Sequence, residues 1–148
     1  LNKVSFIDSF EIKKIYPSTI KIKIFEKIPI AIIQNKNIKS FYTRSGDVIN
    51  YIELKKFEKL PIVFGNKENF KIIYANLKKL NFPLNDIKTF LLFESKRWDL
   101  VTNQNITIKL PIKNYKKSLE NFMSIKDQYD FKKYKIFDYR INNQLILK

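Results

Sequence analysis

Apolar and charged residues alternate along several stretches of this chain, and the alternation predicts strands. The clearest stretch is residues 20–26, Ile-Lys-Ile-Lys-Ile-Phe-Glu, where a period of two predicts a strand with one wet face. Residues 1–15 have a mixed pattern that does not distinguish between elements. The other short apolar or strand-like runs, separated by turn-forming residues, are 30–33, 41–43, 48–49, 60–65, 87–94, 97–102, 106–112, 134–141 and 145–147.

Two segments instead have apolar residues at helical spacing. Residues 68–80 carry Phe70, Ile73, Tyr74, Leu77 and Leu80, and residues 115–125 carry Tyr115, Leu119, Phe122 and Met123. Asn66 and Asn114 stand where an N-cap residue is expected. Several strand pairs together with two helices indicate an α+β fold with a largely antiparallel mixed sheet. Trp98, the single tryptophan, is expected in the core of this sheet.

The composition excludes most enzyme classes. The 148 residues include no Cys and no His, which removes disulfides, Cys/His zinc sites and histidine-based acid–base mechanisms. The two glycines, Gly46 and Gly65, provide no glycine-rich phosphate loop. The acidic residues show no pairing typical of acid–base catalysis. We therefore expect a protein that is not an enzyme and has no cofactor and no metal.

The formal charge of +15, from 29 Lys and Arg against 14 Asp and Glu, raises nucleic acid as a partner. Only three of the 29 are Arg, and the lysines occur as scattered pairs rather than blocks. Lys, Ile and Asn share AT-rich codons, so we interpret the excess mainly as a solvated surface charge. A basic nucleic-acid-binding domain remains an alternative. No apolar run approaches the roughly 18 residues that span a bilayer.

An ordered series of motifs resembles the extracytoplasmic region of the FtsQ/DivIB family of bacterial cell-division proteins. Tyr16-Pro17-Ser18-Thr19 and Glu26-Lys27-Ile28-Pro29 look like the family's passage from a POTRA domain into its β domain. The later matches are 41–48, Leu60 to Gly65, the Arg97-Trp98 hairpin, and Phe137-Asp138-Tyr139-Arg140. The sequence departs from the family pattern at Thr43, at Gln104-Asn105 and at Pro111.

The resemblance implies a domain organisation and a function. Residues 1–28 would be the C-terminal part of a POTRA domain, and residues 29–148 an FtsQ/DivIB-type β domain with two or more packed helices. Such proteins are non-enzymatic scaffolds of the division machinery, or divisome, that bind FtsB and FtsL. The chain begins at Leu1, so we expect a piece of a single-pass inner-membrane protein, extracytoplasmic (periplasmic) here and enriched at the division septum. A POTRA-containing outer-membrane assembly or secretion protein is a further alternative.

The last two strand-like runs are the candidate binding site. They are expected to leave a sheet edge open, and an open edge can accept a strand from a partner. The resemblance implies that FtsB docks at Arg140, Ile141, Asn142, Asn143, Gln144, Leu145 and Ile146. Arg140 would hold a partner carboxylate, and Arg140→Glu is expected to weaken binding without changing thermal unfolding. Alternatively, Arg140 only pairs with Asp138 in an ordinary sheet.

Overall fold

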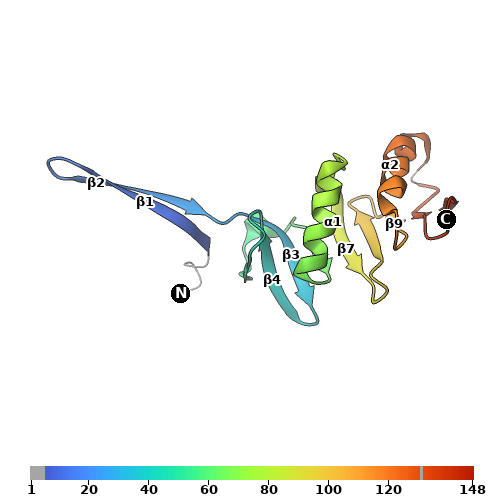
Figure 1. Cartoon of the computed structure of the whole chain (residues 1–148), viewed down its shortest axis with the longest axis horizontal. Coiled ribbons are helices and arrows are strands. Elements are labelled where there is room, and N and C mark those ends of the chain that lie inside the picture. The colour runs from blue at the N-terminus through green and yellow to red at the C-terminus, as the bar shows by residue number, and fades with distance from the viewer. Residues whose placement is uncertain (1–5, 131) are drawn as a thin grey trace.

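The structure, a computed structural model, describes residues 6–130 and 132–148. A nine-stranded sheet forms the body of the molecule, and a separate two-stranded hairpin projects from one end of it (Figure 1). The hairpin consists of β1 (Ile7–Ile15) and β2 (Thr19–Glu26), joined by a turn that contains a cis Tyr16–Pro17 peptide. The fold is therefore α+β, as the alternation and periodicity predict.

The large sheet has the strand order β11-β10-β9-β8-β7-β6-β3-β4-β5. Neighbouring strands are antiparallel except in the pairs β3–β6, β6–β7 and β9–β10, which are parallel. One α-helix lies between β6 and β7 along the chain, and another lies between β9 and β10. Such a helical crossover is the usual connection between parallel strands. The strand bounds are β3 (Pro29–Asn35), β4 (Ile38–Thr43), β5 (Val48–Asn50), β6 (Ile62–Phe64), β7 (Ile87–Leu92), β8 (Trp98–Thr102), β9 (Thr107–Lys109), β10 (Ile136–Asp138) and β11 (Ile146–Leu147).

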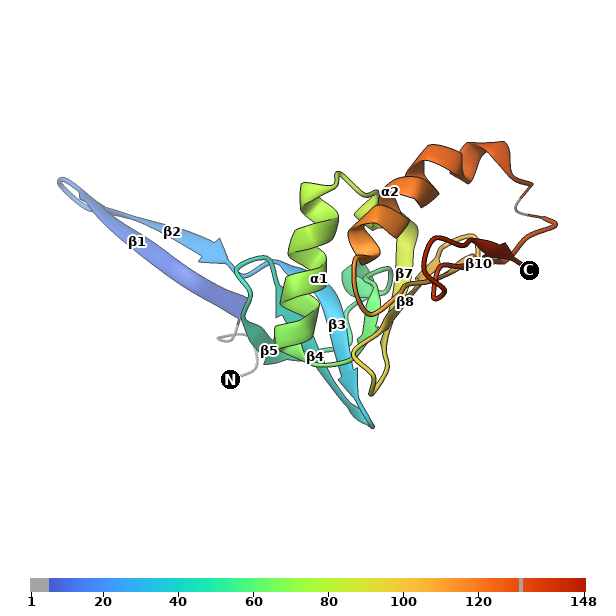
Figure 2. The same cartoon turned by 45° about the vertical axis from the view of Figure 1, so that its right-hand side comes forward.

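Helices α1 (Lys67–Lys79) and α2 (Tyr115–Ile125) lie on the same face of the sheet (Figures 1 and 2). The apolar stripe of α1 is buried, as predicted, and Phe70 contacts the rings of Tyr42 and Phe90 edge-on at 5.0 and 5.1 Å. Phe90 also contacts Trp98, which is only 6% exposed and belongs to this core. Edge-to-face contacts of this kind fix how the helix packs on the strands.

The opposite face of the sheet is covered only in part. Ile32, Phe41 and Ile49 form a second, smaller core there, closed by residues of the 51–60 segment and by Phe6. The ring of Phe6 lies 5.9 Å from that of Phe41, so the base of the hairpin is attached to the main sheet. Neither α1 nor α2 covers this face at β8, β9 and β10, because both helices lie on the other side of the sheet (Figures 1 and 2).

Strand β1 of the hairpin lies within residues 1–15, for which the sequence pattern did not distinguish between elements. Strand β1 pairs with β2 along its whole length, although a bulge between Ile7 and Ser9 interrupts the alternation and obscures the pattern in the sequence. Residues 1–5 lie outside the described part of the chain. One face of the hairpin is apolar and open to solvent, with each of its large side chains more than half exposed: Phe10, Ile12, Ile20, Ile22 and Ile24.

The C-terminal strands are shorter than predicted. Strand β10 ends at Asp138, and the predicted continuation to residue 141 is wrong. The carboxylate of Asp138 accepts the backbone N–H of Arg140 at 3.1 Å, so this group does not join the ladder. Asn143 has a positive φ of 57°, and Gln144 N–H donates to the carbonyl of Ile141, which closes a turn. Leu145 also lies outside β11, which is limited to Ile146–Leu147.

Candidate functional site

The last strand of the large sheet, β11, leaves its outer edge open among the residues that the structure describes. Ile136 and Lys148 exchange both backbone hydrogen bonds, at 2.9 and 3.1 Å. In an antiparallel ladder the next pair along does not exchange bonds, and here that pair is Phe137 and Leu147. The N–H and C=O of Leu147 therefore point away from β10. The open sheet edge that the sequence predicts is present, although β11 is only two residues long.

The sequence-predicted site residues are brought together by the loop that joins β10 to β11. Residues 140–145 lie in this loop, and only Ile146 lies on a strand. Ile141 is 52% exposed, whereas Leu145 packs against the main core. The loop is therefore a surface feature next to the open edge rather than part of that edge.

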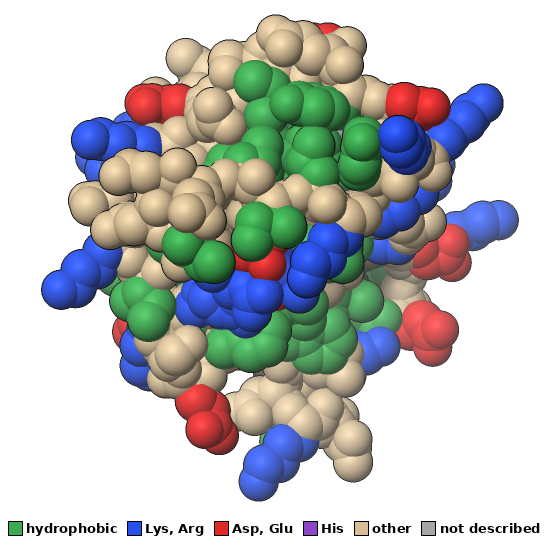
Figure 3. Space-filling view, turned by 90° about the vertical axis from the view of Figure 1, so that its right-hand side faces the viewer, with side chains coloured by type: hydrophobic (Ala, Val, Ile, Leu, Met, Phe, Trp, Pro, Cys, Tyr) green, Lys and Arg blue, Asp and Glu red, His purple; other side chains and the backbone are tan. Residues whose placement is uncertain are grey.

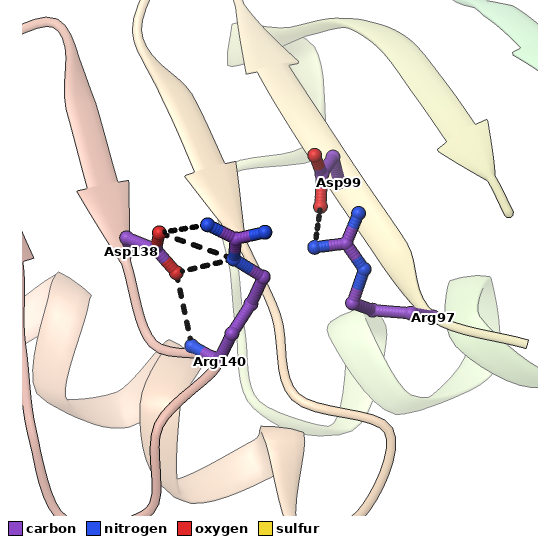
Figure 4. Close-up of polar contacts among 4 residues, drawn as sticks. All are labelled: Arg97, Asp99, Asp138 and Arg140. Atoms are coloured by element: carbon purple, nitrogen blue, oxygen red, sulfur yellow. Dashed lines mark hydrogen bonds and ion pairs between the residues drawn. The ribbon is translucent and has the colours of Figure 1, made fainter. Parts of the chain in front are cut away.

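Arg140 is held against Asp138 at the start of this loop (Figure 4). Its Nε donates to both carboxylate oxygens, at 2.8 and 3.1 Å, and its Nη2 donates to Oδ2 at 2.6 Å. These hydrogen bonds hold the pKa of Asp138 below its usual range. The Asp138 side chain is 5% exposed, so Arg140 satisfies a buried carboxylate. We therefore expect Arg140→Glu to lower the stability of the fold as well as any binding, unlike the expectation from the sequence.

A second ion pair lies beside the first on the face that no helix covers (Figure 4). Arg97 Nη1 lies 3.5 Å from Asp99 Oδ1, and neither of these buried atoms has a hydrogen-bond partner among the described residues. Burial raises the pKa of Asp99, although Arg97 and Lys109 act in the opposite direction. Lys109 pairs in register with both Asp99 and Asp138. The sequence analysis did not single out this group of charged residues, namely Arg97, Asp99, Lys109 and Asp138. The alternation of apolar and charged residues within each strand could have indicated that they share one face.

A cavity of about 490 Å³ opens between α2 and the 139–145 loop. Two lysines, three small polar residues and Tyr139 contribute to its wall, together with the loop itself, and none of the lining residues is acidic. Sequence reasoning missed its α2 side, because nothing in the sequence indicates that the start of α2 faces this loop. The lining residues are Pro111, Lys113, Asn114, Lys117, Ser118, Asn121, Tyr139, Ile141, Asn142, Asn143, Gln144 and Leu145.

The end of the molecule that carries the C-terminus combines basic and apolar side chains. Figure 3 shows Lys and Arg side chains gathered near the middle of this face around an acidic one, with hydrophobic side chains above and below them. Ile112 is 55% exposed and Ile141 52%.

Two further features limit the chemistry of the described residues. No group of three or more acidic residues lies close enough together in this part of the chain to hold a metal ion. Within the same described ranges, neither helix has the length and apolar character needed to cross a membrane.

The chain matches known proteins in sequence. The family model of the C-terminal region of cell division protein FtsQ/DivIB matches residues 31–140. The cell division protein FtsQ of Rickettsia conorii is 29% identical over 151 residues, covering 100% of this chain and 57% of the relative. That of Rickettsia bellii is 32% identical over 115 residues, covering 74% of this chain and 43% of the relative. The chain thus spans about half the length of the curated relatives that it matches.

A solved structure is also similar. The major extracytoplasmic domain of DivIB from Geobacillus stearothermophilus aligns with a TM-score of 0.47 and 12% identity, covering 72% of this chain and 98% of that one. The match of the family model covers well over half of the present chain, from β3 to the loop after β10. This chain belongs to the FtsQ/DivIB family of bacterial cell-division proteins.

Proposed function

We propose that this chain is the extracytoplasmic part of a non-enzymatic divisome scaffold, and that it binds FtsB and FtsL by accepting a partner strand on the outer edge of β11. The observation that carries the proposal is the outward direction of the N–H and C=O of Leu147. A strand edge with unpaired main-chain groups is a template for a strand from another chain. Main-chain hydrogen bonds then supply affinity, and side-chain contacts supply specificity.

The side chains around β11 suit such a partner. Ile141 is 52% exposed beside the edge and can contact an apolar partner residue. Arg140 uses Nε and Nη2 for Asp138, which leaves Nη1 to donate to a partner carboxylate. Because Asp138 holds the guanidinium in place, less side-chain entropy is lost on binding. In this proposal Arg140 pairs with Asp138 and also binds a partner carboxylate, which the sequence analysis gave as alternatives.

We also propose that residues 1–28 are the end of a POTRA domain and that a membrane helix elsewhere in the protein holds this region outside the cytoplasm at the septum. The support is the apolar face of the hairpin. A two-stranded hairpin is marginally stable alone in water, and this one exposes Ile12 and Ile22 by 62% and 59%. The remainder of a POTRA domain would cover that face.

Amide hydrogen exchange of this protein, alone and with the extracytoplasmic segment of FtsB from the same organism, tests strand addition. The Leu147 amide points outward and should exchange rapidly in the free protein. In the complex it should become protected by at least about tenfold, because a partner carbonyl would accept its hydrogen. The amide of Asn50 on β5, at the opposite end of the sheet, is the control and should not change.

Two results would contradict the proposal. Binding of FtsB without any protection at Leu147 would show that the partner uses another surface. Protection at Asn50 in place of Leu147 would move the partner strand to the β5 edge. A repeat with FtsL, alone and mixed with FtsB, shows whether FtsL contacts the same edge.

A further inference from the structure

We propose that the cavity between α2 and the 139–145 loop receives an acidic side chain of the same partner polypeptide that adds a strand to β11. This inference rests on the proposed function, because it names a second contact for that partner. It concerns α2, which the strand-addition proposal does not use. The cavity volume of about 490 Å³ is large enough for a carboxylate side chain together with part of its backbone.

The charge of the wall selects an acidic occupant. Lys113 and Lys117 both line the cavity, and its lining includes no Asp or Glu to neutralise them. Neither lysine is in an ion pair with another described residue. Both lysines are exposed, so a carboxylate that enters the cavity is attracted by two cations at once, in an interaction that added salt weakens.

The wall of the cavity also contains polar side chains that can donate hydrogen bonds. The hydroxyl of Tyr139 donates to Oδ1 of Asn121 at 2.9 Å. Asn121 and Ser118 both line the cavity, and each carries a side-chain group that can donate a hydrogen bond to a carboxylate. Tyr139 is only 6% exposed and its own N–H donates to the carbonyl of Lys109, so this part of the wall is fixed before any partner binds.

The cavity and the open edge are continuous along the chain. Gln144 and Leu145 line the cavity, and β11 begins at the next residue, Ile146. A partner strand on the outer edge of β11 that continues past Leu145 therefore reaches the loop that borders the cavity. Figure 2 shows α2 above the C-terminal strands, on the side where this loop lies. One polypeptide can thus make both contacts.

Charge reversal of the two cavity lysines tests the inference. The double variant Lys113→Glu, Lys117→Glu should bind the extracytoplasmic segment of FtsB about tenfold to a hundredfold more weakly in isothermal titration calorimetry. The matched control is Lys71→Glu, Lys116→Glu, which changes the net charge by the same amount at exposed helix positions outside the cavity. The control should bind within about twofold of the unmodified protein.

A complementary change in the partner completes the test. Replacing each acidic residue of the FtsB segment by its amide should reproduce the loss at one position, and replacing that residue by Lys should restore binding to the Glu double variant. If the Glu variant is less stable in thermal unfolding, Lys113→Gln, Lys117→Gln replaces it, with a smaller expected loss.

The outcomes separate this inference from strand addition. Unchanged affinity of the cavity variant, with Leu147 still protected in the complex, would overturn the cavity contact and leave strand addition intact. An equal loss in the control would reduce the effect to general charge attraction and would also overturn the cavity contact. If the cavity variant loses affinity but the Leu147 amide is not protected in the complex, the contact of the acidic side chain is supported. Strand addition to β11 is then refuted.

Discussion

The guanidinium of Arg140 closes on the buried carboxylate of Asp138 from two residues further along the chain, with Nη2 to Oδ2 at 2.6 Å and Nε to Oδ1 at 2.8 Å. The same carboxylate accepts the backbone N–H of Arg140. Asp138 therefore ends β10, shapes the start of the loop and orients the arginine at the proposed interface. A substitution at either residue changes stability as well as any binding.

We expect Asp138→Asn to lower the free energy of unfolding at neutral pH by about 1.5–3 kcal/mol, since hydrogen bonds to a charged group are lost. Urea unfolding followed by circular dichroism measures the change. Asp130→Asn is the control, because that carboxylate makes its hydrogen bond at an exposed turn. An unchanged unfolding midpoint for Asp138→Asn would show that the pair does not stabilise the fold.

The two buried aspartates should give pH dependences of opposite sign. The pKa of Asp138 is lowered in the folded state, so its stabilising contribution is present above the unfolded value of about 3.8 and is lost as the pH falls through the folded value. The pKa of Asp99 is raised, so its contribution is present at low pH and is lost as the pH rises through the folded value.

Unfolding free energies between pH 7 and pH 2.5 check both signs. The stability difference between the unmodified protein and Asp138→Asn should shrink as the pH falls. As the pH falls, the free energy of unfolding of the unmodified protein should instead rise relative to that of Asp99→Asn. Parallel curves for the two variants would contradict the assignment of different environments to Asp99 and Asp138.

Asn66 and Asn114 precede the two helices but act differently. Asn66 Oδ1 accepts the N–H of Asn69 at 2.9 Å, whereas Asn114 has φ 59° and no capping hydrogen bond. Asn66→Ala should therefore lower the unfolding free energy by about 1 kcal/mol. Asn114→Gly should lower it little or raise it, because glycine adopts positive φ without strain. Equal losses for the two variants in thermal unfolding would contradict this distinction.

Gly65 follows β6 at a close approach to the neighbouring strands. A Cβ at this position would lie 3.0 Å from Leu92 Cβ and 3.2 Å from Trp98 Cη2. Gly65→Ala should therefore lower the free energy of unfolding by about 1–3 kcal/mol, because it overpacks the core. Tryptophan fluorescence reports the transition at Trp98. Lys67→Ala, two residues away and exposed, is the control and should lie within about 0.5 kcal/mol of the unmodified protein.

The apolar face of the hairpin yields a test of the domain proposal. Ile22 lies on this face and Lys21 on the other. In the full-length protein, Ile22→Asp should lower the unfolding free energy by about 2–3 kcal/mol, because a charge would enter a packed interface. Lys21→Asp should lower it by less than about 0.5 kcal/mol. Similar values for the two variants in urea unfolding would show that nothing covers the hairpin.

The elements with local signals were predictable. The periodicity of α1, its cap at Asn66 and the alternation of β2 each reside in consecutive residues, so the physical cause lies within the segment itself. The length of β10 was not predictable in this way. Residues 139–141 retain a strand-like composition, but the side chain of Asp138 captures the N–H of Arg140, and only the folded geometry shows this competition.

The candidate site shows the same division. Alternation and the order of elements, both readable from the residues alone, predict that the segment after β10 lies at the end of an α+β sheet. The folded chain alone shows that β11 is the edge strand, with the N–H and C=O of Leu147 directed outward. It also shows that Lys113 and Lys117 line the same cavity as the 139–145 loop. Register and helix placement depend on contacts between residues far apart in the chain, and no local pattern encodes them.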